Sequence, residues 1–279
     1  MTEGNIMRKS FKELESLSKQ IRRCIIETIA NAQKGHLGGA LSSVDILTYL
    51  YFSGFLNHDS KNPNWKDRDR LFLSKGHAGT GLLSVLAKAG YFEESELLST
   101  FNRDGSRFGN NPDESIPGIE IHTGSLGHGL SIGAGHALST KLNKQDLKTV
   151  VLLSDGECHE GSIWEGAMFA GHHQLSNLLA IVDRNKQCCD EFTEKCLKLE
   201  PLGDKFKSFN WSVYNANGHD FESIHETFIK INNDTSGLPK MIIAETVKGK
   251  GVSFMEGIVK WHHSVPNSEE RELAINELS

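Results

Sequence analysis

The first part of the chain carries apolar residues at helical spacing. Between about Phe11 and Gln33 an apolar residue recurs every three or four positions, which predicts a helix with one buried face. The residues that carry this pattern are Leu14, Leu17, Ile21, Ile25 and Ile29. Gly35 interrupts the pattern, and we expect a second helix to pass through Leu47 and Leu50.

A short strand and a long connection are expected next. Arg70–Leu73 reads as a short buried strand, and a helix rich in Ala, Gly and Leu begins after Gly76 and His77. Residues 98–120 are polar and contain several glycines, which predicts a long irregular connection. Long ordered connections of this kind more often serve a function than not.

In the second half, short apolar runs alternate with helical segments. The runs have the length of strands and are apolar throughout, as in a parallel sheet that is buried on both faces. They are Thr149–Leu153, Leu178–Val182, Trp211–Tyr214 and Met241–Ala244, with a helix from about Ser162 to His173 after the first. The alternation predicts an α/β fold with a doubly wound, mostly parallel sheet and helices on both faces, in a single domain over residues 1–279.

Composition narrows the possible partners. The 279 residues carry 30 basic and 36 acidic side chains, a net charge of −6, which favours neither nucleic acid nor an anionic membrane surface as a partner. No apolar run approaches the ~20 residues of a membrane span. The N-terminal residues are too polar for a signal peptide, so we expect a cytoplasmic protein. The five cysteines form no CxxC pair, which argues against a disulfide framework and a structural zinc site.

Two polar side chains are predicted to meet at one edge of the sheet. Asp155 and Asn185 follow successive strands, and about thirty residues separate them, which is the length of one strand–helix–strand unit. A carboxylate, an amide oxygen and a loop carbonyl supply part of the six-oxygen shell of Mg²⁺, which phosphate and water can complete. Gly156 lets the backbone approach a phosphate, and the next helix begins with N–H groups suited to anions.

The stretch that contains both residues resembles the thiamine diphosphate signature of the transketolase family. Its sequence is SDGECHEGSIWEGAMFAGHHQLSNLLAIVDRNKQ. The resemblance implies that thiamine diphosphate is bound with Mg²⁺, for which Ca²⁺ or Mn²⁺ can substitute. It implies that Asp155, Asn185 and the carbonyl of Gln187 hold the metal, and that Gly156 and Glu157 contact the cofactor. Glu160 and Glu165 match glutamates at the interface between the two cofactor-binding halves. Ser154 stands where the signature has its first glycine.

Further segments resemble the same family. His36, His77 and His262 match histidines that surround the reacting carbons in transketolases. They lie in the segments KGHLGGALSSVDIL, SKGHAGTGLLSVL and VKGKGVSFMEGIVKWHHSVP, respectively. His77 and His262 also match cofactor contacts. Imidazoles suit this role because they exchange protons near neutral pH. The turn in GIEIHTGSLGHGL matches backbone contacts to the aminopyrimidine end of the cofactor. Its residues are Gly124, Ser125 and Leu126.

Some positions depart from the family pattern. Asn111 stands where a substrate-contacting His is usual, and His122 where a small hydroxyl residue is usual. The loop CCDEFTEKC lacks the usual Asp-Gly turn, and no role can be assigned to Cys158, Cys188 or Cys189. These departures suggest a donor or acceptor other than the standard pentulose phosphates. We expect His136 on a helix surface and leave His128 unassigned.

The resemblance extends from about Leu14 to Pro266 and implies the diphosphate-binding, N-terminal subunit of a split transketolase. A partner chain is then expected to carry the pyrimidine-binding domain and the glutamate that activates the cofactor, in an α₂β₂ assembly. The implied reaction transfers a two-carbon ketol unit from a ketose, which we expect to be a phosphate, to an aldose. Two alternatives stay open. One is another thiamine enzyme, such as an acyloin-forming synthase or a 2-oxo acid decarboxylating component; the other is a catalytically silent binding or regulatory subunit.

Overall fold

The computed structural model describes residues 8–279, in which one parallel sheet organises the chain. The strands are β1 (Arg70–Leu73), β2 (Thr149–Ser154), β3 (Leu178–Arg184), β4 (Ser212–Asn217) and β5 (Lys240–Glu245). Their spatial order is β1-β2-β3-β5-β4, and all neighbouring pairs are parallel. The predicted doubly wound α/β fold is confirmed.

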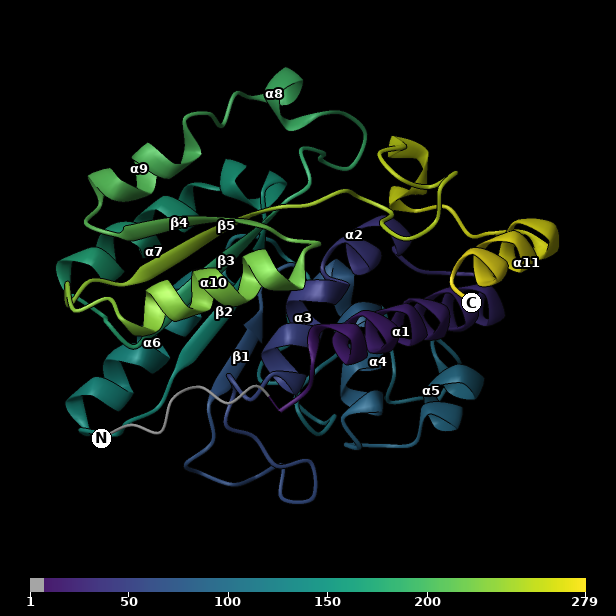
Figure 1. The fold of residues 1–279 in the computed structure, drawn as a ribbon, viewed down its shortest axis with the longest axis horizontal. Coiled ribbons are helices and arrows are strands. Elements are labelled where there is room, and N and C mark those ends of the chain that lie inside the picture. Colours follow the sequence, from purple (N-terminus) through teal and green to yellow (C-terminus); the bar gives the residue numbers. More distant parts are fainter. Residues whose placement is uncertain (1–7) are drawn as a thin grey trace.

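Helices cover both faces of the sheet (Figure 1). One face packs against α1 (Phe11–Ala32), α3 (Val44–Phe52), α4 (Gly79–Lys88) and α10 (Phe221–Asn232). The other packs against α6 (Gly129–Leu142), α7 (Gly161–His172) and α9 (Leu202–Ser208). Shorter elements complete the described chain: α2 (Leu37–Ser42), η1 (Gly76–Ala78), α5 (Glu94–Thr100), η2 (Gly156–His159), α8 (Thr193–Cys196), η3 (Val259–His262) and α11 (Ser268–Glu277).

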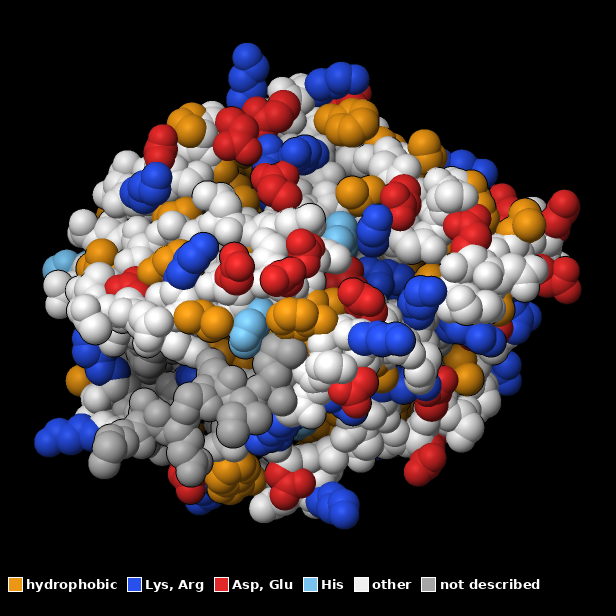
Figure 2. Space-filling model, viewed as in Figure 1, with side chains coloured by type: hydrophobic (Ala, Val, Ile, Leu, Met, Phe, Trp, Pro, Cys, Tyr) orange, Lys and Arg blue, Asp and Glu red, His pale blue; other side chains and the backbone are white. Residues whose placement is uncertain are grey.

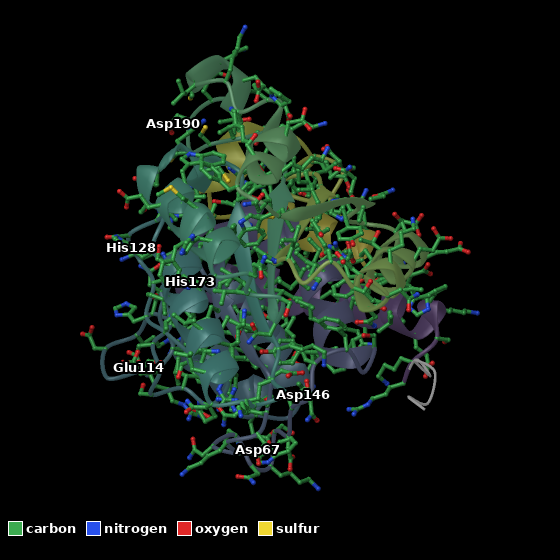
Figure 3. The ribbon with its side chains drawn as sticks, turned by 90° about the vertical axis from the view of Figure 1, so that its left-hand side faces the viewer. Asp67, Glu114, His128, Asp146, His173 and Asp190 are labelled. Carbon is green, nitrogen blue, oxygen red and sulfur yellow. The ribbon has the colours of Figure 1, made fainter. Side chains whose placement is uncertain are left out.

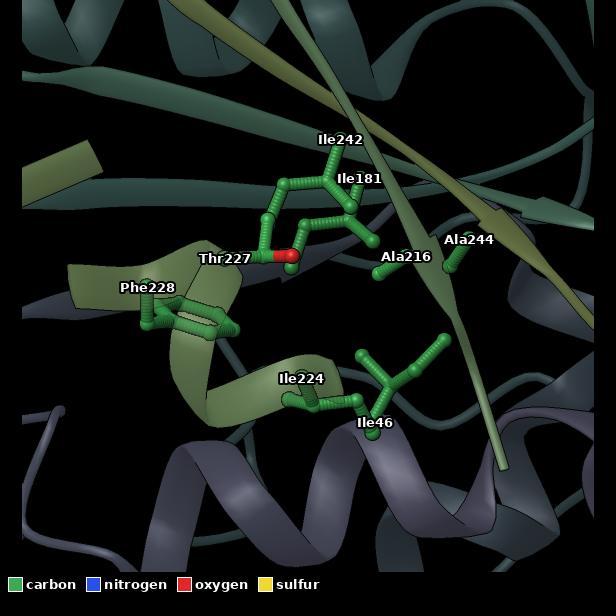
Figure 4. A pocket seen from close by; sticks show the side chains of 8 residues that line it. All are labelled: Ile46, Ile181, Ala216, Ile224, Thr227, Phe228, Ile242 and Ala244. Atoms are coloured by element: carbon green, nitrogen blue, oxygen red, sulfur yellow. The ribbon is translucent and has the colours of Figure 1, made fainter. Parts of the chain in front are cut away.

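The two hydrophobic cores explain why the strands are apolar throughout. Along β2, Val150 and Leu152 pack into the core beneath α1, α3 and α10, whereas Val151 and Leu153 pack beneath α6 and α7. Successive side chains of a strand point to opposite faces, so burial on both faces requires an unbroken apolar run. At the first core, a void of only about 10 Å³ lies between α3, α10 and the sheet (Figure 4). Its small size and apolar lining mark it as ordinary core packing.

Most predicted elements agree with the structure to within a few residues. The first helix begins at a capping box, in which Ser10 and Glu13 bond each other's backbone N–H groups, and its last turn ends at Gln33 in the left-handed region (φ 53°). The second helix is divided at Ser43 into α2 and α3. The connection predicted as irregular begins with the last turn of α5, which ends at Thr100.

The sheet has a clear polarity, which Figure 3 displays from the side. Asp190, which follows β3, lies at the opposite end of the molecule from Asp67 and Asp146, which precede β1 and β2. Acidic and basic side chains are interspersed over the face drawn in Figure 2. No helix in residues 8–279 combines the length and the apolar character needed to cross a bilayer.

Candidate functional site

The carboxyl ends of β2 and β3 bring Asp155 and Asn185 to the same place. Ser154 pairs with Asp183 in the parallel register, and Asp155 N–H donates to the Asp183 carbonyl at 3.3 Å. The Asp155 carboxylate also accepts a hydrogen bond of 2.5 Å from the N–H of Lys186, the residue after Asn185. The two side chains therefore occupy adjacent strand tips, as the spacing predicted, at the edge where open α/β sheets bind ligands.

The Asp155 carboxylate is fully buried. Its Oδ2 accepts from the Arg184 guanidinium at 3.0 Å, and its Oδ1 accepts from Gly156 N–H at 2.8 Å. Burial raises the pKa of Asp155 above its usual value, the nearby Asp183 charge adds to this, and Arg184 opposes it. A buried carboxylate that ionises reluctantly gains most from an arriving cation, because the cation supplies the charge that water cannot.

Asp183 fixes the orientation of the Asn185 amide. Its carboxylate accepts from Asn185 Nδ2 at 3.3 Å, from Ser42 Oγ at 2.6 Å, and from Lys75 and Thr246. An ionised carboxylate only accepts, so the NH₂ group of Asn185 must face Asp183, and the amide oxygen must point away. Burial would raise the pKa of Asp183, but Lys75 and the hydroxyl donors outweigh it and hold that pKa below its usual value.

These groups fit a hard cation. Asn185 Oδ1 accepts one bond, from Gln187 N–H at 3.1 Å, and keeps a second lone pair. The antiparallel bridge between Gln187 and Phe192 is made by bonds of Lys186 and Cys188 and does not use the Gln187 carbonyl. A carboxylate, an amide oxygen and a main-chain carbonyl are thus available at neighbouring strand tips, and oxygens of these types are the ligands that Mg²⁺ and Ca²⁺ accept. Within residues 8–279, no cluster of three or more His, Cys, Asp or Glu side chains forms a competing metal site.

A cavity of about 360 Å³ opens beside these strand tips. Its lining combines residues from the loops that follow β1, β2, β3 and β5 with the start of α2 and the turn before α6. They are Gly39, His77, Gly124, Leu126, Ser154, Gly156, Asn185, Gln187, Cys188, Cys189, Lys248 and His262. The loops after β1 and before α6 touch at Gly76, where a Cβ would lie 1.6 Å from the Thr123 carbonyl oxygen. Only glycine permits this approach, which brings His77 close to Gly124.

The three predicted histidines come together at the cavity. The ring centroids of His36, His77 and His262 are 5.3–5.7 Å apart, although the residues belong to three distant segments. Burial, reinforced by neighbouring lysines and histidines, lowers the pKa of His36 to about 4, that of His262 to about 3 and that of His77 well below its usual value. All three imidazoles are therefore neutral near pH 7. His263, which sequence reasoning missed, adds a fourth ring 4.5 Å from His36.

Lys248 is a second residue that sequence reasoning missed. Its side chain is 3% exposed, lines the cavity, and donates from Nζ to the Cys188 carbonyl at 2.6 Å. Burial lowers the pKa of Lys248 to about 8, and Lys75 adds to the effect, while Asp155 and Asp183 oppose it. A buried ammonium beside a predicted cation site is a natural partner for an anionic group such as a diphosphate. The only local signal is the glycine-flanked run KGKG.

The Glu157 side chain is held between three loops around the cavity, and its contact with a cofactor stays a prediction. Its side chain is fully buried and does not line the cavity. The carboxylate accepts from Ser74 Oγ, from Gly127 N–H at 2.8 Å and from Ser154 N–H at 3.2 Å. Burial raises its pKa. Glu157 thus ties together the three loops that carry His77, Gly124–Leu126 and Asp155, and acts on the cavity through their positions.

The remaining predicted residues lie around the rim. Gly124 and Ser125 are exposed in the turn before α6, with Leu126 partly buried beside them. Asn111 and His122 are exposed, and Asn111 Nδ2 lies 3.5 Å from where a Gly124 Cβ would be. Asn110, its neighbour, contacts His36 Nδ1 at 3.2 Å.

Glu160 and Glu165 lie at the start of α7 and are exposed. Nearby on α6 and α7, the side chains of Ile132, Met168 and Phe169 are 42%, 57% and 40% exposed. The two helices pack closely, since a Cβ at Gly166 would lie 2.8 Å from Ser131 Oγ. An exposed apolar face beside acidic residues is typical of a surface that another protein covers.

His136 has a different environment from the one expected. His136 was expected on a helix surface, and this is wrong: the ring is half-buried, bonds Thr149 Oγ1 at 2.8 Å and packs against Phe72. The register of α6 over β1 and β2, which the local pattern does not reveal, places it there.

Cys158 is buried beneath the strand tips, and burial raises its pKa well above the usual value, so its thiol is unsuited to chemistry.

Comparison with known proteins relates this geometry to one family. Residues 14–277 match the family description "Transketolase, thiamine diphosphate binding domain". The chain is 43% identical over 266 residues to one of the subunits of the apulose-4-phosphate transketolase of Phocaeicola vulgatus, covering 95% of this chain and 94% of that protein. It is 40% identical over 267 residues to the 6-deoxy-6-sulfo-D-fructose transketolase subunit SqwG of a Clostridium species, covering 95% and 96%.

Solved structures agree with these relatives. Transketolase from Campylobacter jejuni superimposes with a TM-score of 0.91 at 31% identity, and the match covers 97% of this chain. Transketolase from Leishmania mexicana gives a TM-score of 0.87 at 28% identity, covering 94% of this chain. The chain spans only 43% and 40% of the lengths of those two solved proteins.

Proposed function

The chain belongs to the transketolase family, as a thiamine diphosphate-binding domain, and from this we propose that it transfers a two-carbon ketol unit from a ketose to an aldose as part of a two-chain enzyme. The observation that carries the proposal is the junction of Asp155 and Asn185 at neighbouring strand tips, next to a cavity with clustered histidines. When bound, thiamine diphosphate supplies the carbanion chemistry that breaks and forms carbon–carbon bonds.

The first role proposed for this chain is to bind Mg²⁺ and the diphosphate. In this proposal Asp155, Asn185 and the Gln187 carbonyl are the metal ligands, and Ca²⁺ or Mn²⁺ can replace Mg²⁺. The Lys248 ammonium faces the diphosphate, and Gly156 leaves room for it at the strand tip. Gly124, Ser125 and Leu126 lie where the aminopyrimidine end would be held, and Glu157 secures their turn from beneath.

In this proposal the histidines accept protons from the substrate and return them. Neutral imidazoles at His36, His77 and His262 can each accept a proton from a sugar hydroxyl and return it, which bond cleavage next to a hydroxyl-bearing carbon requires. Their depressed pKa values keep the basic form present at neutral pH. In this proposal His77 and His262, which line the cavity, also contact the cofactor, and His36, whose ring lies 5.7 and 5.3 Å from theirs, contacts the substrate.

A partner chain completes the enzyme in this proposal. The two relatives named above are designated subunits, which supports a split transketolase whose second chain carries the pyrimidine-binding domain and an activating glutamate. The exposed apolar face on α6 and α7, flanked by Glu160 and Glu165, is the surface we assign to that contact. We propose an α₂β₂ assembly in the cytoplasm, acting in carbohydrate metabolism.

The donor is proposed to be a ketose that bears an anionic group. One relative is named for a sugar phosphate and another for a sulfonated sugar, so anionic ketoses are the class to test first. Asn111 and His122 lie at the rim, and we propose that they adapt the site to a donor other than a standard pentulose phosphate.

The decisive experiment combines the chain with its partner subunit. Calorimetry should show thiamine diphosphate binding that requires Mg²⁺ and disappears with EDTA, and incubation with ketose phosphates and an aldose should transfer a two-carbon unit. Turnover of pyruvate without ketol transfer would instead indicate an acyloin-forming or decarboxylating enzyme. Failure to bind thiamine diphosphate and Mg²⁺ would overturn the proposal, because it would indicate a silent subunit.

A further inference from the structure

The backbone that carries Lys248 is held on both sides of that residue. On one side, Val247 N–H donates to His219 Nε2 at 2.7 Å. On the other, the Lys250 carbonyl accepts from Arg22 Nε at 2.9 Å. Lys248 follows β5 directly in the chain, and these two contacts come from the first helix and from the loop after β4. The segment is therefore clamped by parts of the chain that are remote from it in sequence.

Both clamping side chains are anchored on a single buried carboxylate. Arg22 forms a two-pronged ion pair with Asp45, with bonds of 2.9 and 2.6 Å, and His219 Nδ1 bonds Asp45 Oδ2 at 2.8 Å. Arg22 and Asp45 are each only 4% exposed. Burial opposes ionisation of Asp45, but Arg22 and His219 outweigh it and hold its pKa well below the usual range. The carboxylate is thus a permanent charge that fixes both partners.

The hydrogen bonds determine the tautomer of His219. A backbone N–H can only donate, so Nε2 must be the unprotonated nitrogen that accepts from Val247. The proton then resides on Nδ1 and is donated to Asp45. Each of the three side chains has a defined donor or acceptor role. Their common effect is on the backbone at residues 247 and 250 and not on the cavity itself.

The position of the Lys248 ammonium depends on this backbone. Its Nζ donates to the Cys188 carbonyl, and the stem is packed so closely that a Cβ at Gly38 would lie 2.8 Å from Lys248 Cγ. A long flexible side chain binds an anion well only when its root is fixed, because otherwise ordering it opposes binding.

We propose that Arg22, Asp45 and His219 are positioning residues that aim Lys248 at the diphosphate of the cofactor. The inference rests on the proposed function, since it takes Lys248 to face that diphosphate. None of the three lines the cavity, so their effect passes through the Lys248 backbone.

The test is a double-mutant cycle on the enzyme reconstituted with its partner, read as the Kd for thiamine diphosphate with Mg²⁺. His219→Asn keeps a donor for Asp45 but leaves Val247 N–H without an acceptor, and we expect affinity to fall about tenfold, or about 1.4 kcal/mol. His219→Gln, whose amide oxygen reaches the place of Nε2, should stay within about threefold of wild type. Arg22→Lys, which loses the bond to Lys250, should resemble His219→Asn and serves as the second variant should the latter fold poorly.

The cycle is closed with Lys248→Met. If the cluster acts by aiming Lys248, His219→Asn or Arg22→Lys should change Kd less than about twofold in the Lys248→Met background. An equal loss in both backgrounds, or no loss in the wild-type background, would overturn the inference and leave the proposed function intact. A wild-type enzyme that binds no thiamine diphosphate would instead refute the proposed function, and the inference with it.

Discussion

Lys75 and Asp183 form a salt bridge in which neither side chain is accessible to solvent. The Asp183 carboxylate also holds Asn185 Nδ2, so this pair lies directly behind a proposed metal ligand. Lys75 donates a second bond, of 3.0 Å, to the Gly39 carbonyl at the cavity. One ion pair therefore links the loop that follows β1 with the end of β3 and the start of α2.

Removing one partner of this pair should destabilise the protein strongly. Lys75→Met leaves the Asp183 charge buried without its counter-ion, and we expect a loss of about 3–5 kcal/mol in the free energy of unfolding, measured by urea denaturation. The double variant Lys75→Met/Asp183→Leu removes both charges and should be more stable than the single variant. A single variant that loses less than about 1 kcal/mol would show that the pair is solvated in solution.

Glu157→Gln tests the carboxylate that joins three loops. The wild-type group only accepts, from a hydroxyl and two N–H groups, whereas the amide NH₂ of Gln must face at least one of those donors. We expect a loss of about 1–3 kcal/mol in unfolding free energy. Glu160→Gln, an exposed change in the same turn, should leave it nearly unchanged. Equal stability of the two variants would contradict the bonding described for Glu157.

Asp155→Asn tests the metal site with little change in shape. The amide keeps an oxygen for N–H donors but loses the charge that draws a cation. Loss of an outer-shell partner typically weakens metal binding about 10–100-fold, and loss of a direct ligand should do at least as much. The Mg²⁺ concentration needed for half-maximal thiamine diphosphate binding, followed by calorimetry, measures this. Asp190→Asn, an exposed change in the following loop, is the matched control and should have no effect.

Local patterns predicted the sheet well but underestimated its length at the site. The strand expected to end at Val182 continues to Arg184, which pairs with Glu245 of β5. Charged residues normally mark the end of a buried strand, and here they do not because Lys75 neutralises Asp183 while Asp155 and Glu200 neutralise Arg184. Those partners are distant in sequence, so no local pattern reveals them.

At the candidate site too, features set by local sequence were predictable, and features set by distant residues were not. Asp155 and Asn185 were predictable because strand register and crossover length are regular features of parallel sheets. Lys248 and His263 were missed because their significance arises only from burial and from proximity to distant loops. The inward position of the Glu157 carboxylate was not predictable, since a strand-end turn does not specify which side chains point inward.

The clustered histidines should make the protein sensitive to acid. Their folded-state pKa values lie below the ordinary value of 6.5, so the unfolded chain binds more protons than the folded chain between about pH 6.5 and the folded values. The contribution of these histidines to the free energy of unfolding is therefore complete above pH 6.5 and falls as the pH decreases toward 4. Unfolding free energies from pH 7.5 to 4.5 should fall less steeply when His36, His77 and His262 are replaced by Asn. An unchanged slope would mean that other groups govern acid unfolding.

Thiamine diphosphate binding should take up a proton at alkaline pH through Lys248. In the free protein its pKa is lowered to about 8, so above that value the ammonium is mostly deprotonated. The diphosphate favours the charged form and raises this pKa, so affinity should decrease as the pH rises above 8 while proton uptake on binding increases. Calorimetry at pH 8.5 in buffers with different ionisation enthalpies should detect uptake of up to about three-quarters of a proton, and little at pH 7. Lys248→Met should abolish the uptake, whereas Lys260→Met, at an exposed position of the same segment, should retain it; uptake that persists in Lys248→Met would assign the proton to another group.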